Sequence, residues 1–296
     1  LKLEIHCGGP DLETQLMQTE HDLRRVIVDI GRRMYESGMI AATDGNVSVR
    51  LGDGKILTTP TMVCKGRMTE EMMVVVDQEG RKLRRDERNP SSELPMHLTI
   101  YRLRPDVRAV VHAHPPFATG FAVANVPLDK PLLSEVILTL GCIPLTAYGT
   151  PSTSEVSDSL IPFIPHHDAL LLANHGAVSY GPDLETAYAR METLEHFAKI
   201  TLIAKLVGRP TELSAEAIGK LLDVRERAGY MSREARSCQV CGYLEGHSDG
   251  CSAGEVAATP RVQNGGQQEE TITLTRGELN TLITEAARLV AQELEK

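Results

Sequence analysis

Three histidines have side chains and positions in the sequence that could hold a metal ion. His112 and His114 lie two residues apart in the apolar run 107–114, and His175 lies near the end of the apolar run 169–179. Because alternate residues of a strand point to the same face, His112 and His114 can bind one cation at roughly 2.0–2.1 Å per bond. His175 would complete a site with three protein ligands and an open position, as catalysis requires. The alternative is three separate histidines with ordinary hydrogen bonds; the His-Ala-His spacing favours the metal.

Glu93 is the carboxylate that we associate with this site. It follows Ser91 and Ser92, either of which can cap a helix that runs to about Leu103. In one interpretation Glu93 handles protons as an acid or base. In the other it only interacts favourably with the positive N-terminal end of that helix. The spacing alone leaves both interpretations open.

Several polar side chains could bind a phosphate. Hydroxyls and the free amides of a helix N-terminus form an anion site without needing Lys or Arg. Lys65 and Arg67 would add charge nearby, but we expect both side chains to be solvated. Taken singly, each candidate is more typical of an ordinary turn or helix cap. The candidates are Asn46, Thr61, Ser91 and Ser92.

Hydrophobic periodicity predicts the elements that position these residues. Helical spacing predicts long helices over residues 20–37 and 183–207. Asp44-Gly45-Asn46 is a turn motif, and a mixture of strands and helices through residue 210 predicts an α/β fold. The strand order does not follow from the sequence. Strands are predicted over residues 47–49, 56–59, 74–76, 107–114 and 169–179.

The chain is expected to have four parts. Residues 1–19 are an N-terminal extension, and residues 20–230 are the catalytic domain. Residues 231–270 become rich in Gly, Ser, Gln and Glu, which predicts a flexible linker. Residues 271–296 contain an amphipathic helix that begins with the capping box Thr275 and Glu278.

Charge and composition exclude some classes of function. The net charge of −9, from 31 basic and 40 acidic residues, disfavours binding to nucleic acid or to an anionic membrane. No apolar run approaches the ~20 residues that span a bilayer, and the first ten residues do not resemble a secretory signal. Six scattered cysteines predict free thiols in a reducing, cytoplasmic environment. A structural zinc is the alternative for Cys238, Cys241, His247 and Cys251, which we interpret as free side chains.

Five motifs in register resemble the class II aldolase/adducin family. They lie at residues 45–50, 59–61, 90–93, 110–114 and 175–176, within a resemblance that covers roughly residues 20–210. The resemblance implies an α/β/α sandwich around a mainly antiparallel central sheet. It also implies a homotetramer with active sites between subunits.

The same resemblance implies roles for individual residues. One zinc ion per subunit would be held by His112, His114 and His175. Glu93 would be the catalytic acid/base, and would bind the metal when substrate is absent. The substrate's phosphate would be bound by the four candidates already named, Asn46, Thr61, Ser91 and Ser92.

Glu93 also bears on the substrate. The sugar-phosphate 4-epimerase branch of the family carries Asp after the paired serines, whereas the fuculose-phosphate aldolase branch carries Glu, as this chain does. We therefore expect retro-aldol cleavage of L-fuculose 1-phosphate, or a similar deoxyketose 1-phosphate, to dihydroxyacetone phosphate and lactaldehyde. Two residues depart from that branch: Met62 replaces a Gly, and Glu135 lies near the position of a Tyr that reaches a neighbour's active site. The alternatives are an epimerase or dehydratase on this scaffold, or a non-catalytic adducin-like module.

The C-terminal helix resembles the encapsulation peptides that carry enzymes into bacterial microcompartments. Such helices place an apolar stripe in a groove on a partner, here a shell protein. The resemblance implies a location inside a microcompartment of the cytoplasm. The alternative is a helix that packs back on the enzyme or helps it to oligomerise.

Overall fold

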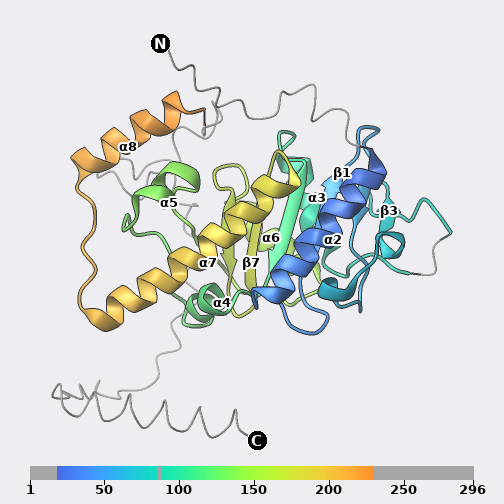
Figure 1. Cartoon of the computed structure of the whole chain (residues 1–296), viewed down its shortest axis with the longest axis horizontal. Coiled ribbons are helices and arrows are strands. Elements are labelled where there is room, and N and C mark those ends of the chain that lie inside the picture. Colours follow the sequence, from blue (N-terminus) through green and yellow to red (C-terminus); the bar gives the residue numbers. More distant parts are fainter. Residues whose placement is uncertain (1–18, 86–87, 230–296) are drawn as a thin grey trace, which may run out of the picture. The chain divides into compact units, whose positions relative to one another are not determined.

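One seven-stranded sheet forms the centre of the protein. The computed structural model describes residues 19–85 and 88–229 (Figure 1). The strand order is β3-β2-β1-β4-β7-β6-β5, and every neighbouring pair is antiparallel except β5 and β6. The predicted, mainly antiparallel sheet is therefore confirmed. The strands are β1 (Asn46–Arg50), β2 (Ile56–Thr58), β3 (Val74–Val76), β4 (Ala109–Ala113), β5 (Leu145–Thr146), β6 (Ala169–Leu172) and β7 (Gly176–Gly181).

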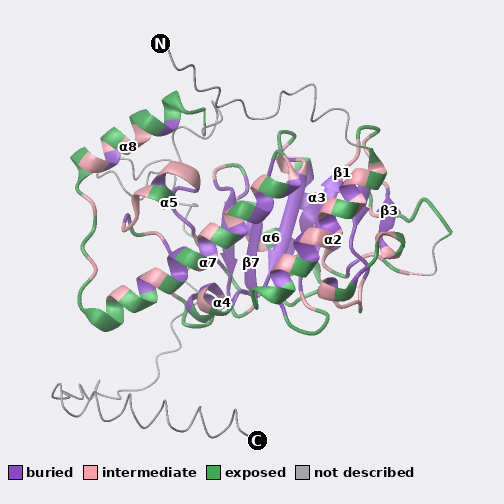
Figure 2. Cartoon of the chain, in the orientation of Figure 1, coloured by how far each residue is buried: buried purple, intermediate pink, exposed green. Residues whose placement is uncertain are grey.

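Helices cover both faces of the sheet, because successive strand residues point to opposite sides. Val111 packs in the core under α2 (Glu20–Glu36) and α7 (Leu184–Val207), which lie side by side across one face (Figure 1). Its neighbour Val110 packs in a second core. The strands are buried on both faces (Figure 2), which confirms the α/β/α sandwich. The second core lies under α3 (Leu94–Leu103) and α6 (Ser154–Leu160).

Short helices complete the described chain. Two single turns of 3-10 helix, η1 (Lys65–Arg67) and η2 (Glu70–Met72), contact α2. In the described ranges, no helix combines the length and apolarity that crossing a bilayer requires. The expected linker, the C-terminal helix and the Cys238 to Cys251 cluster lie outside the described residues. The remaining helices are α4 (Pro116–Val123), α5 (Ser134–Thr139) and α8 (Ala215–Arg227).

Caps place the two long helices where the sequence predicts them. Thr19 and Asp22 form a capping box at the start of α2, and Asp183 accepts from the amide of Thr186 at the start of α7. The predicted start of α3 at Ser91 or Ser92 is wrong. The amide of Ser91 donates to the carbonyl of Thr59, residues 92–93 form a turn, and α3 begins after Glu93.

The prediction of a single strand over 169–179 is also wrong. Residues 173–175 form a turn between β6 and β7, which pair with each other as an antiparallel hairpin. Asn174 has a φ of 54°, in the left-handed region that Asn tolerates well in turns. The uniform apolar pattern on both sides of this turn conceals the reversal. His175 therefore lies in the turn rather than on a strand.

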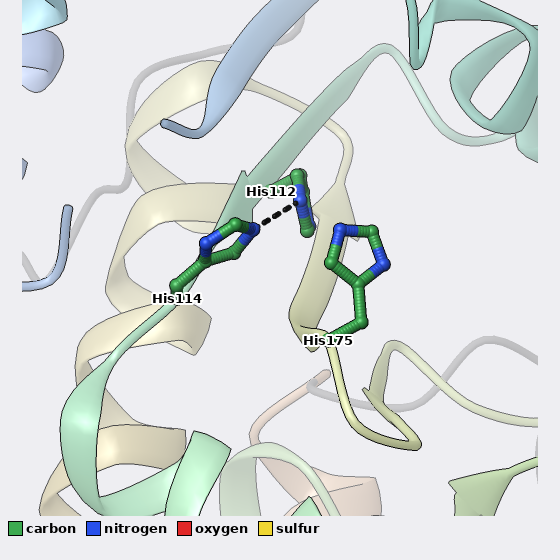
Figure 3. A group of neighbouring side chains, drawn as sticks. All are labelled: His112, His114 and His175. Atoms are coloured by element: carbon green, nitrogen blue, oxygen red, sulfur yellow. Dashed lines mark hydrogen bonds between the residues drawn. The ribbon is translucent and has the colours of Figure 1, made fainter. Parts of the chain in front are cut away.

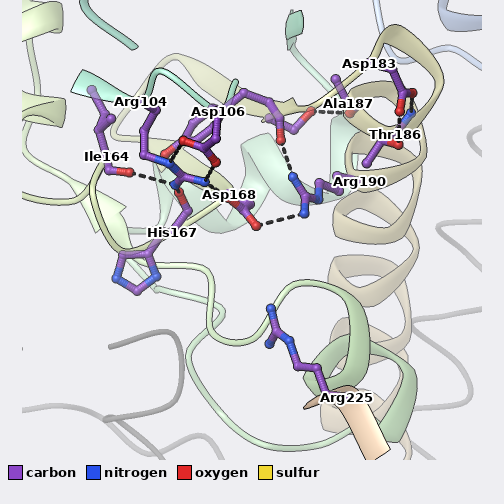
Figure 4. A network of polar contacts seen from close by, with 12 residues as sticks. Arg104, Asp106, Ile164, His167, Asp168, Asp183, Thr186, Ala187, Arg190 and Arg225 are labelled. Atoms are coloured by element: carbon purple, nitrogen blue, oxygen red, sulfur yellow. Dashed lines mark hydrogen bonds and ion pairs between the residues drawn. The ribbon is translucent and has the colours of Figure 1, made fainter. Parts of the chain in front are cut away.

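An ion-pair network connects the C-terminal end of α3, the residue before β6 and α7 (Figure 4). The buried carboxylate of Asp168 contacts Arg104 Nη2 at 3.0 Å and Arg190 Nη2 at 2.8 Å. Removing one member of a buried pair leaves an uncompensated charge, which typically costs about 3–5 kcal/mol. We expect Asp168→Ala to lower the free energy of unfolding by about that amount, measured by urea denaturation.

Asp106 offers a matched control for this prediction. Its carboxylate also contacts Arg104, at 2.7 Å, but its side chain is 51% exposed. Exposed ion pairs contribute roughly 0–1 kcal/mol, so Asp106→Ala should have a much smaller effect. If Asp168→Ala and Asp106→Ala lowered the free energy of unfolding equally, the expectation that the buried ion pair contributes more than the exposed one would be contradicted.

Candidate metal centre

The three histidines predicted to bind a metal converge at one end of β4 and β7 (Figure 3). His112 is on β4, His114 follows that strand, and His175 lies in the turn that leads into β7. The Nε2 atoms of His112 and His114 are 3.1 Å apart. The ring centroid of His175 is 4.8 Å from that of His112 and 5.1 Å from that of His114.

Two glycines permit this convergence. A Cβ atom at Gly176 would lie 2.5 Å from the carbonyl oxygen of Ala113 and 2.7 Å from the ring of His114. A Cβ atom at Gly45 would lie 2.9 Å from the carbonyl oxygen of His112, and Gly45 has a φ of +69°. The backbone can therefore approach β4 this closely only where the side chain is absent.

The hydrogen bonds of the rings favour a cation between them. Nδ1 of His112 lies 2.8 Å from the carbonyl oxygen of Ala177, which can only accept, so Nδ1 carries the proton and the neutral ring would present its Nε2 lone pair to a cation. Bonds of roughly 2.0–2.1 Å at tetrahedral angles place ligand nitrogens about 3.3 Å apart. The 3.1 Å between the His112 and His114 Nε2 atoms is close to that spacing. The donor set thus fits a divalent cation.

Glu93 lies against the same nitrogens. Its two carboxylate oxygens are 2.9 Å from His175 Nε2 and 3.2 Å from His112 Nε2. The Oε2 atom also accepts a hydrogen bond from Asn46 Nδ2 at 2.8 Å. Burial raises the pKa of Glu93, but the contacts with His112 and His175 outweigh it and hold the pKa well below its ordinary value. Glu93 is therefore ionised and positioned to contact a cation held by the histidines.

His114 is kept neutral, as a ligand must be. Burial and the charges of His112 and His175 lower the pKa of His114 to about 4. At neutral pH its imidazole therefore offers a lone pair without first losing a proton.

The candidate phosphate residues lie on adjacent segments. The amide of Thr59 donates to the carbonyl of Val47 on β1. Residues 59–61 also pair with residues 89–91, where the amide of Thr61 donates to the carbonyl of Asn89 at 3.0 Å. This pairing places the three segments next to one another, and Asn46 of the first segment contacts Glu93. Ser91 is buried, Thr61 half-buried and Ser92 exposed. The buried Oδ1 of Asn46 has no hydrogen-bond partner among the described residues.

Glu135 is not brought to the histidines of its own chain. It is exposed in the first turn of α5, a helix that contacts α7 and α8. Its carboxylate has no hydrogen-bond or ion-pair partner within the described chain. Action in a neighbouring subunit's site stays a prediction.

Met62 occupies a backbone position that suits glycine. Its φ is +56° and its side chain is 79% exposed. A left-handed conformation costs a residue with a Cβ atom roughly 1–2 kcal/mol, which exceeds the roughly 0.5–1 kcal/mol that glycine loses in unfolded-state entropy. We expect Met62→Gly to raise the free energy of unfolding by about 0.5–1 kcal/mol. Met62→Ala, which keeps the Cβ atom, is the matched control and should give no such gain in the same denaturation experiment.

Two charged residues near the site were not recognised from the sequence. The sequence predicts only a turn at Asp44, but the Oδ2 atom of Asp44 lies 3.5 Å from His114 Nδ1. Lys65 was expected to be solvated, and this is wrong: the residue is 2% exposed, and its ammonium donates to the carbonyl of Thr43 at 2.6 Å. Arg67 is exposed, as expected. No local pattern distinguishes Lys65 from Arg67, because the burial of Lys65 depends on contacts distant in sequence.

Comparisons with known proteins show what the chain is similar to. The profile of the Class II Aldolase and Adducin N-terminal domain matches residues 25–202. The 3-oxo-tetronate 4-phosphate decarboxylase of Escherichia coli strain K12 is 34% identical over 211 residues, covering 69% of this chain and 97% of that protein. The L-fuculose phosphate aldolase of Escherichia coli O6:H1 is 33% identical, covering 68% and 93%. A solved structure of L-fuculose 1-phosphate aldolase superposes with a TM-score of 0.65 at 29% identity, covering 71% of this chain and 99% of that chain.

Proposed function

The chain belongs to the class II aldolase and adducin family, and we propose that it is a zinc-dependent aldolase that cleaves a phosphorylated deoxyketose. The proposed substrate is L-fuculose 1-phosphate or a close analogue, and the products are dihydroxyacetone phosphate and lactaldehyde. The observation that carries the proposal is the convergence of three histidine rings with the Glu93 carboxylate against two of them. An adducin-like module without catalysis would not need this arrangement.

The proposed cofactor is one divalent cation per subunit. When bound, it supplies Lewis-acid chemistry that polarises the carbonyl next to the bond to be cleaved. His112, His114 and His175 would hold it. Imidazole nitrogens suit zinc, and also cobalt, iron and manganese, so zinc is the proposed and not the only possible ion.

The chain's own residues would bind the substrate and move its protons. Glu93 is ionised and in contact with the histidine nitrogens, so its carboxylate can transfer a proton at the carbon that loses its partner in the cleavage. Asn46 donates to Glu93 and so fixes the direction of that carboxylate. The phosphate would be bound by hydroxyls and amides of Asn46, Thr61, Ser91 and Ser92.

A second candidate is decarboxylation of a phosphorylated 3-oxo acid, the activity in the name of one relative. Both reactions break a carbon–carbon bond beside a carbonyl, but retro-aldol cleavage must also remove a proton from a hydroxyl beyond that bond. Release of carbon dioxide from a carboxylate needs no such base. The observation that favours this candidate is Glu135, because the chain lacks a phenol near the position where the aldolase branch carries Tyr.

One experiment separates the two candidates. The purified enzyme is incubated with L-fuculose 1-phosphate and, separately, with 3-oxo-tetronate 4-phosphate, each with and without a chelator. Chelator-sensitive release of dihydroxyacetone phosphate from the first supports the aldolase. Chelator-sensitive release of carbon dioxide from the second alone replaces the aldolase by the decarboxylase. Metal-loaded enzyme that is inactive on both substrates would contradict both candidates and return attention to an epimerase or dehydratase.

We also propose how the enzyme assembles. A homotetramer of 32.4 kDa chains would have a mass of about 130 kDa by light scattering. The C-terminal helix is proposed to bind a microcompartment shell protein, on the strength of its amphipathic pattern at the end of a polar linker. Residues 271–296 fused to a fluorescent reporter should concentrate at shells in shell-producing cells. A diffuse signal would contradict targeting and favour a helix that packs on the enzyme.

A further inference from the structure

We infer that Asp44 orients His114 for metal binding, and that Lys65 holds Asp44 in place. Both are positioning residues, and the inference rests on the proposed metal-dependent function. It assigns a role to two charged side chains that the proposed chemistry does not otherwise use.

The contact between Asp44 and His114 is on the side of the ring that faces away from the metal site. His114 Nε2 points to His112 Nε2 at 3.1 Å, whereas His114 Nδ1 lies 3.5 Å from Asp44 Oδ2. A carboxylate near Nδ1 favours the tautomer with the proton on Nδ1, which leaves the Nε2 lone pair for a cation. The negative charge also makes the imidazole a stronger electron donor.

The three candidate ligands differ in what lies next to their Nδ1 atoms. His112 has a rigid backbone acceptor, the carbonyl of Ala177 at 2.8 Å. Nδ1 of His175 is buried and has no hydrogen-bond partner among the described residues. His114 alone of the three has a carboxylate at Nδ1, and this carboxylate lies on a loop. Its orientation therefore depends on how firmly that loop is held.

Lys65 holds this loop through a hydrogen bond to its backbone. Its ammonium donates to the carbonyl of Thr43, the residue before Asp44, at 2.6 Å. A buried ammonium requires nearby negative charge. The carboxylates of Asp44 and Glu93 both act to raise the pKa of Lys65, against the lowering effect of burial. Lys65 therefore contributes a hydrogen bond to the loop and a charge that attracts Asp44.

The backbone of Lys65 is itself fixed by close packing of η1 on α2. A Cβ atom at Gly31 of α2 would lie 2.7 Å from the carbonyl oxygen of Lys65. A Cβ atom at Gly66 would lie 2.4 Å from the ring of Tyr35, also on α2. Because neither position has space for a Cβ atom, η1 packs closely against α2. Lys65 thus links a rigid helix to the loop of the metal site.

The same loop serves both sides of the site. Asp44 contacts His114, and Asn46, two residues on, donates to Glu93 at 2.8 Å. The intervening Gly45 lies so close to the carbonyl of His112 that a Cβ atom would have no space there. A displacement of the loop would therefore disturb a metal ligand and the proton-transferring carboxylate together.

The test is Zn²⁺ affinity of the full-length apoprotein, measured by competition with a chromogenic chelator. Loss of the outer partner of a metal-binding histidine typically weakens metal affinity by about 10–100-fold, and we expect this of Asp44→Ala. Asp44→Asn should be intermediate, because its amide oxygen presents a partial negative charge to Nδ1 but no full charge. Lys65→Met should weaken affinity less. The loss of affinity on Lys65→Met should be smaller in the Asp44→Ala background than in the wild type, because part of the effect of Lys65 passes through Asp44.

Asp53 and Lys55 provide matched controls. They form an ion pair in the β1–β2 turn, at the end of β1 opposite Asn46, and their side chains are about half exposed. Asp53→Ala and Lys55→Met repeat both charge changes and should leave Zn²⁺ affinity at the wild-type value. Thermal melts of the apoproteins report on folding separately. If Lys65→Met does not fold, Lys65→Gln replaces it, because its amide can still donate to Thr43.

The outcomes are distinct. Wild-type affinity in Asp44→Ala overturns the inference and leaves the proposed function intact. An equal loss on Lys65→Met in the wild-type and Asp44→Ala backgrounds overturns the link between Lys65 and Asp44. A wild-type protein that binds none of Zn²⁺, Co²⁺ and Mn²⁺ would refute the metal site itself, and with it both proposals.

Discussion

His175→Ala is expected to abolish metal-dependent turnover, with a fall in kcat/KM of more than about 10³-fold. Metal ions contribute several kcal/mol of transition-state stabilisation, and each 1.36 kcal/mol corresponds to a factor of ten. The position is well suited to the test, because His175 lies in a turn and its Nδ1 has no hydrogen-bond partner among the described residues. Its loss should therefore remove a ligand with little damage to the fold. Metal content and turnover of the purified variant are measured together.

The control for this prediction is another histidine. His21 on α2 is 72% exposed, with Nδ1 at 3.1 Å from Glu70, and belongs to no cluster of candidate metal ligands among the described residues. His21→Ala should keep both metal and activity. A His175→Ala variant that retains a full complement of metal and wild-type turnover would show that the three rings do not form the site.

Glu93→Gln is expected to lower kcat by about 10²–10⁴-fold, the usual contribution of a positioned acid or base. Glutamine has nearly the same size as glutamate, and its oxygen can still accept from Asn46, but it cannot take up or release a proton. The three histidines remain, so the variant should still contain metal. Steady-state kinetics with the substrate identified by the assay above, together with metal analysis, provide the measurement.

The two variants should therefore fail in different ways. His175→Ala loses metal and turnover together, whereas Glu93→Gln loses turnover and keeps metal. Glu79→Gln is the matched control, since Glu79 lies in an exposed turn and is 65% exposed. Near-wild-type turnover of Glu93→Gln would remove Glu93 from the chemistry and leave it as a residue at the start of α3.

The sequence by itself determined the main elements and the chemical groups of the site. Helical periodicity and local caps such as Thr19 with Asp22 depend on residues a few positions apart, so they can be recognised without the fold. The His-Ala-His spacing is local in the same sense, because strand geometry alone brings His112 and His114 to one face. The sequence also offered His175 and Glu93 as members of the site, the family resemblance assigned their roles, and the structure brings both to the same place.

Only the tertiary structure decided how distant segments meet. The hairpin at Asn174 reverses the chain between two short apolar runs, so apolar periodicity alone did not separate β6 from β7. The start of α3 after Glu93 depends on the pairing of Ser91 with Thr59, which lies 32 residues earlier. Such contacts are made by backbone groups that all residue types except proline carry in full, so side-chain patterns alone do not identify the partners.

The burial of charged side chains is also decided by the tertiary structure and not by the local sequence. Lys65 and Arg67 are two residues apart in one turn, yet one is buried and the other exposed. The difference arises because Gly31 and Gly66 let η1 pack closely on α2, which encloses one side chain and leaves the other in solvent. The role inferred for Asp44 likewise depends on the position of its loop beside β4. The sequence thus names the groups that can do chemistry, and the packing of distant segments decides which of them act together.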